Sequence, residues 1–211
     1  MSLSAVVKLY KDSHRCVNCF EKGYGIVPDS GCRLPQPRWI GPQYWAQPEH
    51  IVVCMVNPGS GKQIEENYEK LLRDFFTGKK QFFHVNDYFR GAMRRWGGGK
   101  YLRVIEHHMN LDLNKIALMN IALCPMVDSN NKDTYPSSAL EECFNKYTLE
   151  IMKELEPSYL VLCGSSIHHF KQRIEDHLGC KVLLAPHYAS RLRLHDLQET
   201  YRKIRENLPT L

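Results

Sequence analysis

The sequence lacks any long hydrophobic run, because its apolar stretches extend over only a few residues each. A helix needs about 18 consecutive apolar residues to cross a bilayer, so we expect no membrane partner. The first residues, MSLSAVVKLYKDSHRC, lack the apolar core of a signal peptide, which predicts a cytoplasmic protein. Internal repeats and low-complexity tracts are also missing, which excludes fibrous and disordered chains.

A large excess of one charge sign is absent as well. The chain has 211 residues, with 28 Lys and Arg against 23 Asp and Glu, and its net charge is +5. This mild basicity permits a nucleic-acid partner without establishing one. The length and the 43% content of hydrophobic residues predict one globular domain over residues 1–211. Nothing indicates an oligomer, so we expect a monomer.

Cysteine, in contrast, is plentiful, with eight residues. Without a secretion signal, metal ligands together with a few buried thiols are favoured over a disulfide framework. Cys16 and Cys19 form one pair, and Cys124 and Cys143 are available as a second. Two such pairs can supply four thiolates to zinc or to an iron–sulfur cluster. The alternatives are that Cys124 and Cys143 are buried thiols, and that Cys32 is the fourth ligand.

The first 48 residues differ from the rest of the chain. Pro35, Pro37 and Pro42 interrupt any helix in this part, which is rich in glycine and proline. We therefore predict an irregular, cysteine-bearing N-terminal segment over residues 1–48. It is held either by a metal or by packing of Trp39 and Trp45 against the main body.

Four short apolar runs follow, at residues 50–56, 115–125, 158–164 and 180–186. Continuous apolar runs, rather than alternating ones, are typical of parallel strands that are covered on both faces. Segments with helical spacing lie between and after these runs, at 64–76, 86–96, 101–111, 137–155, 166–178 and 194–207. The alternation predicts an α/β fold with about four parallel strands. Ligands of such sheets bind outside the carboxyl ends of the strands.

The loop after the first run, VNPGSGK, lacks the spacing of a phosphate-binding P-loop, which argues against a nucleotide triphosphatase. Its Asn57 carries an amide that can orient a water molecule, although a plain turn is the alternative. After the fourth run, His187 lies near Arg191 and Arg193 in the sequence. A histidine at this point can donate a hydrogen bond to a developing anion, or it can be structural.

Aromatic and basic residues alternate in the segment QFFHVNDYFRGAMRRW. One interpretation is an amphipathic helix whose aromatic side chains pack on the sheet. The other is that Phe82 or Phe83 stacks on a flat ligand such as a nucleic-acid base.

Together these segments resemble the uracil-DNA glycosylases, over about residues 16–193. VNPGSG resembles the Gly-x-Asn-Pro-Gly motif of the mismatch-specific and single-strand-selective members, and FFHVNDYF resembles the Phe-x-His segment that follows it there. NIALCP, the helix that carries Cys143, and LVLCG are similar to the iron–sulfur members. PHYASR is similar to the final His-Pro-Ser motif, with Tyr188 in place of the proline.

The resemblance implies a three-layer α/β/α sandwich with a central four-stranded parallel sheet. It implies a 4Fe-4S cluster, with zinc as the alternative, and a partner DNA that contains uracil or a related deaminated base. The implied residues fall into four groups: Asn57 and His187 for catalysis, Phe82 and Asn120 for base binding, Arg191, Leu192 and Arg193 for DNA binding, and Cys16, Cys19, Cys124 and Cys143 for the metal. The implied reaction is cleavage of the N-glycosidic bond.

Two alternative functions use the same residues. A metal-stabilised nucleic-acid-binding protein without glycosylase activity would bind DNA in a salt-sensitive manner and release no base. A different α/β enzyme would act on free nucleosides through the same loops.

Overall fold

The computed structural model describes residues 3–28, 34–56, 58, 66–95, 99–130, 132–190 and 193–209. These residues form an α/β protein with a four-stranded, all-parallel sheet flanked by helices. Contacts within the chain define two compact units. Unit 1 comprises residues 1–37, 56–88 and 120–154, and unit 2 comprises residues 38–55, 89–119 and 155–211.

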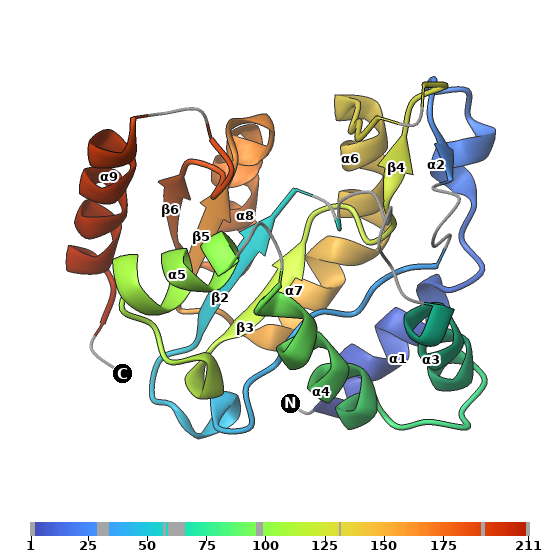
Figure 1. The fold of residues 1–211 in the computed structure, drawn as a ribbon, viewed down its shortest axis with the longest axis horizontal. Coiled ribbons are helices and arrows are strands. Elements are labelled where there is room, and N and C mark those ends of the chain that lie inside the picture. Colours follow the sequence, from blue (N-terminus) through green and yellow to red (C-terminus); the bar gives the residue numbers. More distant parts are fainter. Residues whose placement is uncertain are drawn as a thin grey trace. The chain divides into compact units, whose positions relative to one another are not determined.

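The central sheet contains the strands β2 (Ile51–Met55), β3 (Ala117–Asn120), β5 (Tyr159–Cys163) and β6 (Lys181–Ala185). Their order across the sheet is β3-β2-β5-β6 (Figure 1). In the parallel register, Ile51 lies opposite Tyr159, and Tyr159 lies opposite Lys181. Each of the four apolar runs contains one of these strands, so the predicted parallel sheet is confirmed.

Both faces of β2 and β3 are covered, because every residue of these two strands is buried. On one face, Ile51 and Val53 belong to a hydrophobic cluster that also contains Tyr201 and Ile204 of α9 (Leu194–Glu206). Neighbouring residues of a strand point to opposite faces, so Val52, which is also buried, belongs to the other face. This double coverage explains why the strands appear in the sequence as continuous apolar runs.

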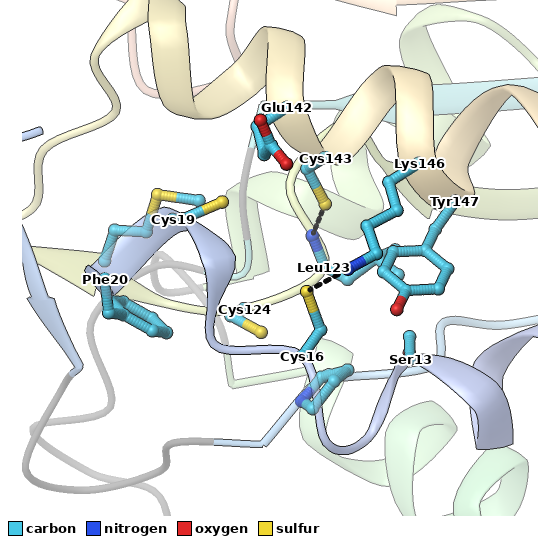
Figure 2. A pocket seen from close by; sticks show the side chains of 12 residues that line it. Ser13, Cys16, Cys19, Phe20, Leu123, Cys124, Glu142, Cys143, Lys146 and Tyr147 are labelled. Carbon is cyan, nitrogen blue, oxygen red and sulfur yellow. Dashed lines mark hydrogen bonds between the residues drawn. The ribbon is translucent and has the colours of Figure 1, made fainter. Parts of the chain in front are cut away.

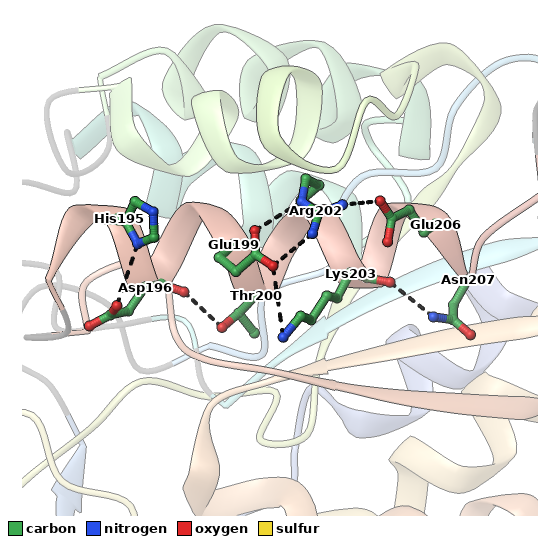
Figure 3. A network of polar contacts seen from close by, with 8 residues as sticks. All are labelled: His195, Asp196, Glu199, Thr200, Arg202, Lys203, Glu206 and Asn207. Atoms are coloured by element: carbon green, nitrogen blue, oxygen red, sulfur yellow. Dashed lines mark hydrogen bonds and ion pairs between the residues drawn. The ribbon is translucent and has the colours of Figure 1, made fainter.

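The other helical elements of unit 2 surround this sheet: η1 (Tyr44–Ala46), α5 (Lys100–Arg103), the π-helical turn η3 (Val104–His108), η4 (Leu113–Lys115), η6 (Ser165–Phe170) and α8 (Lys171–Leu178). The outer face of α9 carries exposed ion pairs, in which Arg202 contacts Glu199 at 2.7 Å and also Glu206 (Figure 3). Such exposed pairs contribute about 0–1 kcal/mol each. The buried inner face of α9 therefore provides most of its stabilisation.

Unit 1 consists mainly of helices: α1 (Leu3–Ser13), α2 (Asn18–Glu21), α3 (Glu66–Phe76), α6 (Ser137–Cys143), the π-helical turn η5 (Phe144–Thr148) and most of α7 (Leu149–Leu155). A short antiparallel pair joins β1 (Val27–Pro28) to β4 (Met126–Val127). Helix α4 (Phe82–Met93) begins in unit 1 and ends in unit 2. None of the described helices is long and apolar enough to cross a membrane.

Part of the N-terminal segment packs as one of the two interpretations predicts. The Trp39 side chain is 2% exposed, and its indole N–H donates to the Leu113 carbonyl oxygen at 2.6 Å. A Cβ atom at Gly41 would lie 2.3 Å from the Asn114 carbonyl oxygen, so the close approach there requires glycine. Residues 3–13, however, form the helix α1, which the sequence analysis did not predict.

Candidate functional site

Four cysteines line one pocket in unit 1. Cys16 and Cys19 lie just before and within α2, Cys124 lies in the segment between β3 and β4, and Cys143 ends α6. Figure 2 shows the four cysteine side chains among the residues that line this pocket. The pocket is otherwise lined partly by apolar side chains, namely Phe20, Pro35, Leu123 and Met126. The structure thus brings together three segments that are far apart in the sequence.

Glu142 fastens the first of these segments to the third. Its carboxylate accepts hydrogen bonds from the Asn18 side chain at 2.9 Å and from the Lys22 ammonium group at 2.6 Å. These two bonds hold the pKa of Glu142 below its usual range. Because Glu142 precedes Cys143 and Asn18 precedes Cys19, the contact keeps the two cysteines on facing helices.

Two of the sulfur atoms accept hydrogen bonds within the pocket. The Leu123 backbone N–H donates to Cys143 Sγ at 3.3 Å, and the Lys146 ammonium group donates to Cys16 Sγ at 3.7 Å. Burial, followed by the neighbouring thiols, raises the pKa of Cys19 to about 12. Burial raises the pKa of Cys143 to about 11. Both thiols are therefore protonated at neutral pH, and metal binding would release their protons.

The donor set fits a metal that prefers sulfur ligands. Four cysteines match the ligand number of structural zinc sites and of four-iron clusters, and N–H···S bonds such as that from Leu123 are typical of cluster surroundings. Among the described residues, no three Cys, His, Asp or Glu side chains already form a group that could hold an ion. The metal therefore stays a prediction, supported by the chemistry of the donor set.

In unit 2, His187 follows the end of β6 by two residues and is half-buried. The Ala189 backbone N–H donates to its Nδ1 atom at 3.2 Å. An accepting Nδ1 carries no proton, so the proton of the neutral ring lies on Nε2. Burial lowers the pKa of His187, which keeps the ring neutral at neutral pH. His187 is thus set up as a neutral hydrogen-bond donor through Nε2.

The backbone that leads to His187 is fixed by its neighbours. The Gly164 N–H donates to the Ala185 carbonyl oxygen at 2.8 Å, and the Tyr201 hydroxyl donates to the Pro186 carbonyl oxygen at 2.6 Å. Gly164 has a φ of 124°, a conformation that L side chains rarely adopt. These contacts reduce the freedom of the imidazole, as a preorganised site requires.

The residues predicted for base or DNA binding differ in how far they are exposed. Asn120 is the last residue of β3 and is 3% exposed. Phe82 is 5% exposed and packs edge-on against Phe75, with 6.2 Å between the ring centroids. The adjacent Phe83 is 57% exposed. Arg193 is exposed and lies directly before α9.

Four residues named in the sequence analysis lie outside the described part of the chain. They are Asn57, Arg191, Leu192 and the alternative ligand Cys32. Their predicted roles stay predictions.

Three contributing residues were missed by the sequence analysis. Glu142 and Tyr201 act through contacts with residues distant in the sequence, so no local pattern identifies them. Lys146 follows Cys143 by three residues in one helical stretch, and this spacing places it on the cysteine-bearing face. That signal could have identified it.

Comparison of the sequence with protein-family models and with curated proteins found no match. Function is therefore inferred from the residues and their arrangement.

We expect replacement of His187 with glutamine to weaken the pH dependence of stability. Because burial lowers the pKa of His187, the unfolded chain binds the proton first, and the folded state loses stability as the pH falls through the range below about 6.5. Burial also lowers the pKa of His108, so part of the pH dependence of stability should remain in the His187→Gln protein. Urea unfolding at about pH 7 and pH 5 measures the change.

His177 provides a matched control, because it is an exposed histidine on α8. His177→Gln should lose as much stability between the two pH values as the unchanged protein. A His187→Gln protein that shows the same loss would contradict the assignment.

Proposed function

We propose that this chain is a DNA glycosylase of the uracil-DNA glycosylase type, with a three-layer α/β/α fold and a cysteine-bound metal centre. The observation that carries the proposal is the pocket in unit 1. Its four cysteines are those that the resemblance to the iron–sulfur glycosylases selects, although they come from three separate segments. Within the proposal a four-iron cluster is favoured, with zinc as the alternative.

The strand order supports a ligand site at one edge of the sheet. Along the chain, β2 is the first strand of this sheet. The next strand, β3, lies on one side of β2, and the later strands β5 and β6 lie on the other side. Ligands of such sheets bind outside the carboxyl ends of the strands, where the order reverses. Asn120 ends β3 and His187 follows β6, so each is at the carboxyl end of its strand, and Asn57 comes two residues after β2 in the sequence.

In the proposed reaction, water hydrolyses the bond between the sugar C1′ atom and the base nitrogen. The bond breaks with its electron pair remaining on the base, and the sugar develops positive charge. The His187 Nε2–H donates to an oxygen of the departing base anion, which stabilises it. The water oxygen then bonds to C1′ and releases a proton, and the base takes up a proton.

Six further side chains have proposed roles in this reaction. The Asn57 amide orients the attacking water. Asn120 reads the edge of the base, because an amide both donates and accepts hydrogen bonds. Phe82 stacks on the base, and Arg191, Leu192 and Arg193 hold the opened strand. Extruding the base costs a few kcal/mol, and least in single strands or mismatches.

The metal would take no part in the reaction, and its ligands would be Cys16, Cys19, Cys124 and Cys143. When bound, the metal would crosslink α2, the segment after β3 and α6. It would contribute to no step of base release.

Base release from uracil-containing oligonucleotides tests the proposal. The substrates are one single strand and one duplex with uracil opposite guanine, and the readout is strand breakage after alkali. We expect breakage at the uracil position alone, with cytosine-containing oligonucleotides as controls. Salt-sensitive DNA binding without breakage would favour the non-enzymatic alternative. Base release from free uridine or deoxyuridine but not from DNA would favour a nucleoside enzyme.

A further inference from the structure

Phe83 is the most exposed large hydrophobic side chain of the described residues, at 57%. It lies in the first turn of α4, at the end of the connection from α3, which we call the α3–α4 corner (residues 77–84). Phe82, beside it, is buried against the core. The exposed ring offers a flat apolar surface on which a base can stack.

The Phe83 ring is held in place by its neighbours. The His84 ring stacks against it, with 3.9 Å between the ring centroids and 27° between the planes. The Gln81 backbone N–H donates to His84 Nδ1 at 3.2 Å, which fixes the supporting imidazole. Binding a flat ligand on the Phe83 ring therefore costs little side-chain entropy.

Buried side chains and a backbone hydrogen bond hold the α3–α4 corner in place. Phe75 is fully buried and contacts Phe82, so the last turn of α3 and the first turn of α4 pack together. The Lys80 N–H also donates to the Asp74 carbonyl oxygen at 3.0 Å. These contacts restrict the movement of the backbone that carries Phe83.

The charge of the corner fits a polyanion. Lys79 and Lys80 are exposed, and their side chains form no ion pair with any described residue. They precede Phe83 by four and three residues, so their long side chains can reach phosphates on either side of a base on the ring. Asp87, one turn after Phe83, is the nearest exposed acidic residue along α4.

We propose that the α3–α4 corner binds single-stranded nucleic acid. One base stacks on the open face of Phe83, and Lys79 and Lys80 neutralise the flanking phosphates. Aromatic stacking with lysine contacts is the mode by which proteins bind single strands without reading their sequence. This surface is separate from Phe82, the residue proposed above for base binding, because Phe83 is exposed whereas Phe82 is buried. The inference is tested by binding alone, so its failure is distinguishable from absence of glycosylase activity.

Fluorescence anisotropy with a labelled oligothymidylate of about 16 nucleotides, titrated at several salt concentrations, tests the proposal. We expect Phe83→Ala to weaken binding roughly five- to 150-fold, since one stacked base contributes about 1–3 kcal/mol. The slope of log K against log salt should stay unchanged. The double variant Lys79→Gln/Lys80→Gln should reduce that slope by about 1.4, or 0.7 for each lost phosphate contact.

Three further variants separate stacking from other effects. Phe83→Trp should keep the affinity, and Phe83→Leu should lose it, because leucine is apolar but has no ring. Tyr135→Ala is the matched control, since Tyr135 is an aromatic residue that is 40% exposed elsewhere in unit 1. Unchanged melting curves would show that all variants fold. Wild-type affinity in Phe83→Ala, an unchanged salt slope in the lysine variant, or equally tight binding of a polyglutamate peptide would each overturn the proposal.

Discussion

Replacement of Cys143 with alanine is expected to remove most of the bound metal and to lower the melting temperature of the protein. Cys143 is buried at the end of α6, and its sulfur accepts a hydrogen bond from the Leu123 N–H. Three remaining ligands cannot complete a four-coordinate site. Metal binding contributes folding free energy, and each lost kcal/mol lowers the melting temperature by about 2–4 °C in a chain of this size.

Elemental analysis of the purified protein, together with its visible absorption, measures the loss. Cys180→Ala is the matched control, since Cys180 is a buried cysteine of unit 2 that does not line the pocket. It should keep the metal content of the unchanged protein. Iron together with sulfide in the wild type would assign the cluster, and zinc alone would assign the alternative. Equal metal content in Cys143→Ala and the wild type would refute the ligand assignment.

The sheet could be predicted from the sequence because its strands carry a strong local signal. Burial on both faces makes β2 and β5 continuous apolar runs, which differ clearly from the helical spacing between them. The helix predicted at 137–155 is interrupted by the π-helical turn η5, although helical residues cover the whole range. A five-residue turn of this kind has no distinct pattern of apolar residues.

The N-terminal elements could not be predicted because their local sequence signal is weak. Helix α1 carries three buried residues, Val6, Tyr10 and Ser13, which is a weak apolar stripe. Helix α2 has only four residues, and β1 pairs with β4 over two. Elements this short are stabilised by contacts between distant segments, such as that of Asn18 with Glu142, rather than by local propensity.

The candidate site shows the same division. The two cysteine pairs could be identified from spacing and resemblance, but only the structure places them around one pocket. The choice between Phe82 and Phe83 was open in the sequence, because neighbouring aromatic residues have equal propensity. Their exposed fractions differ, because Phe82 is 5% exposed and Phe83 is 57% exposed.

The second prediction with a large effect concerns His187. Replacement with alanine is expected to lower the rate of base release roughly 100- to 1,000-fold, the usual loss when one donor to a developing anion is removed. The structure gives the physical reason, because the Ala189 N–H holds the proton on Nε2 and burial keeps the ring neutral. Single-turnover release of uracil from a single-stranded oligonucleotide measures the chemical step.

His187→Asn and His177→Ala complete this experiment. Asparagine retains an N–H donor on a shorter side chain, so it should recover part of the rate that alanine loses. His177 is an exposed histidine of α8 whose Nδ1 atom donates to the Arg173 carbonyl oxygen of its own helix at 2.7 Å, and its replacement should leave the rate unchanged. A rate in His187→Ala within about threefold of the wild type would show that another group stabilises the leaving base. In that case the fixed Nε2–H would have a structural role, and the pH dependence of stability expected for His187 would persist without a catalytic one.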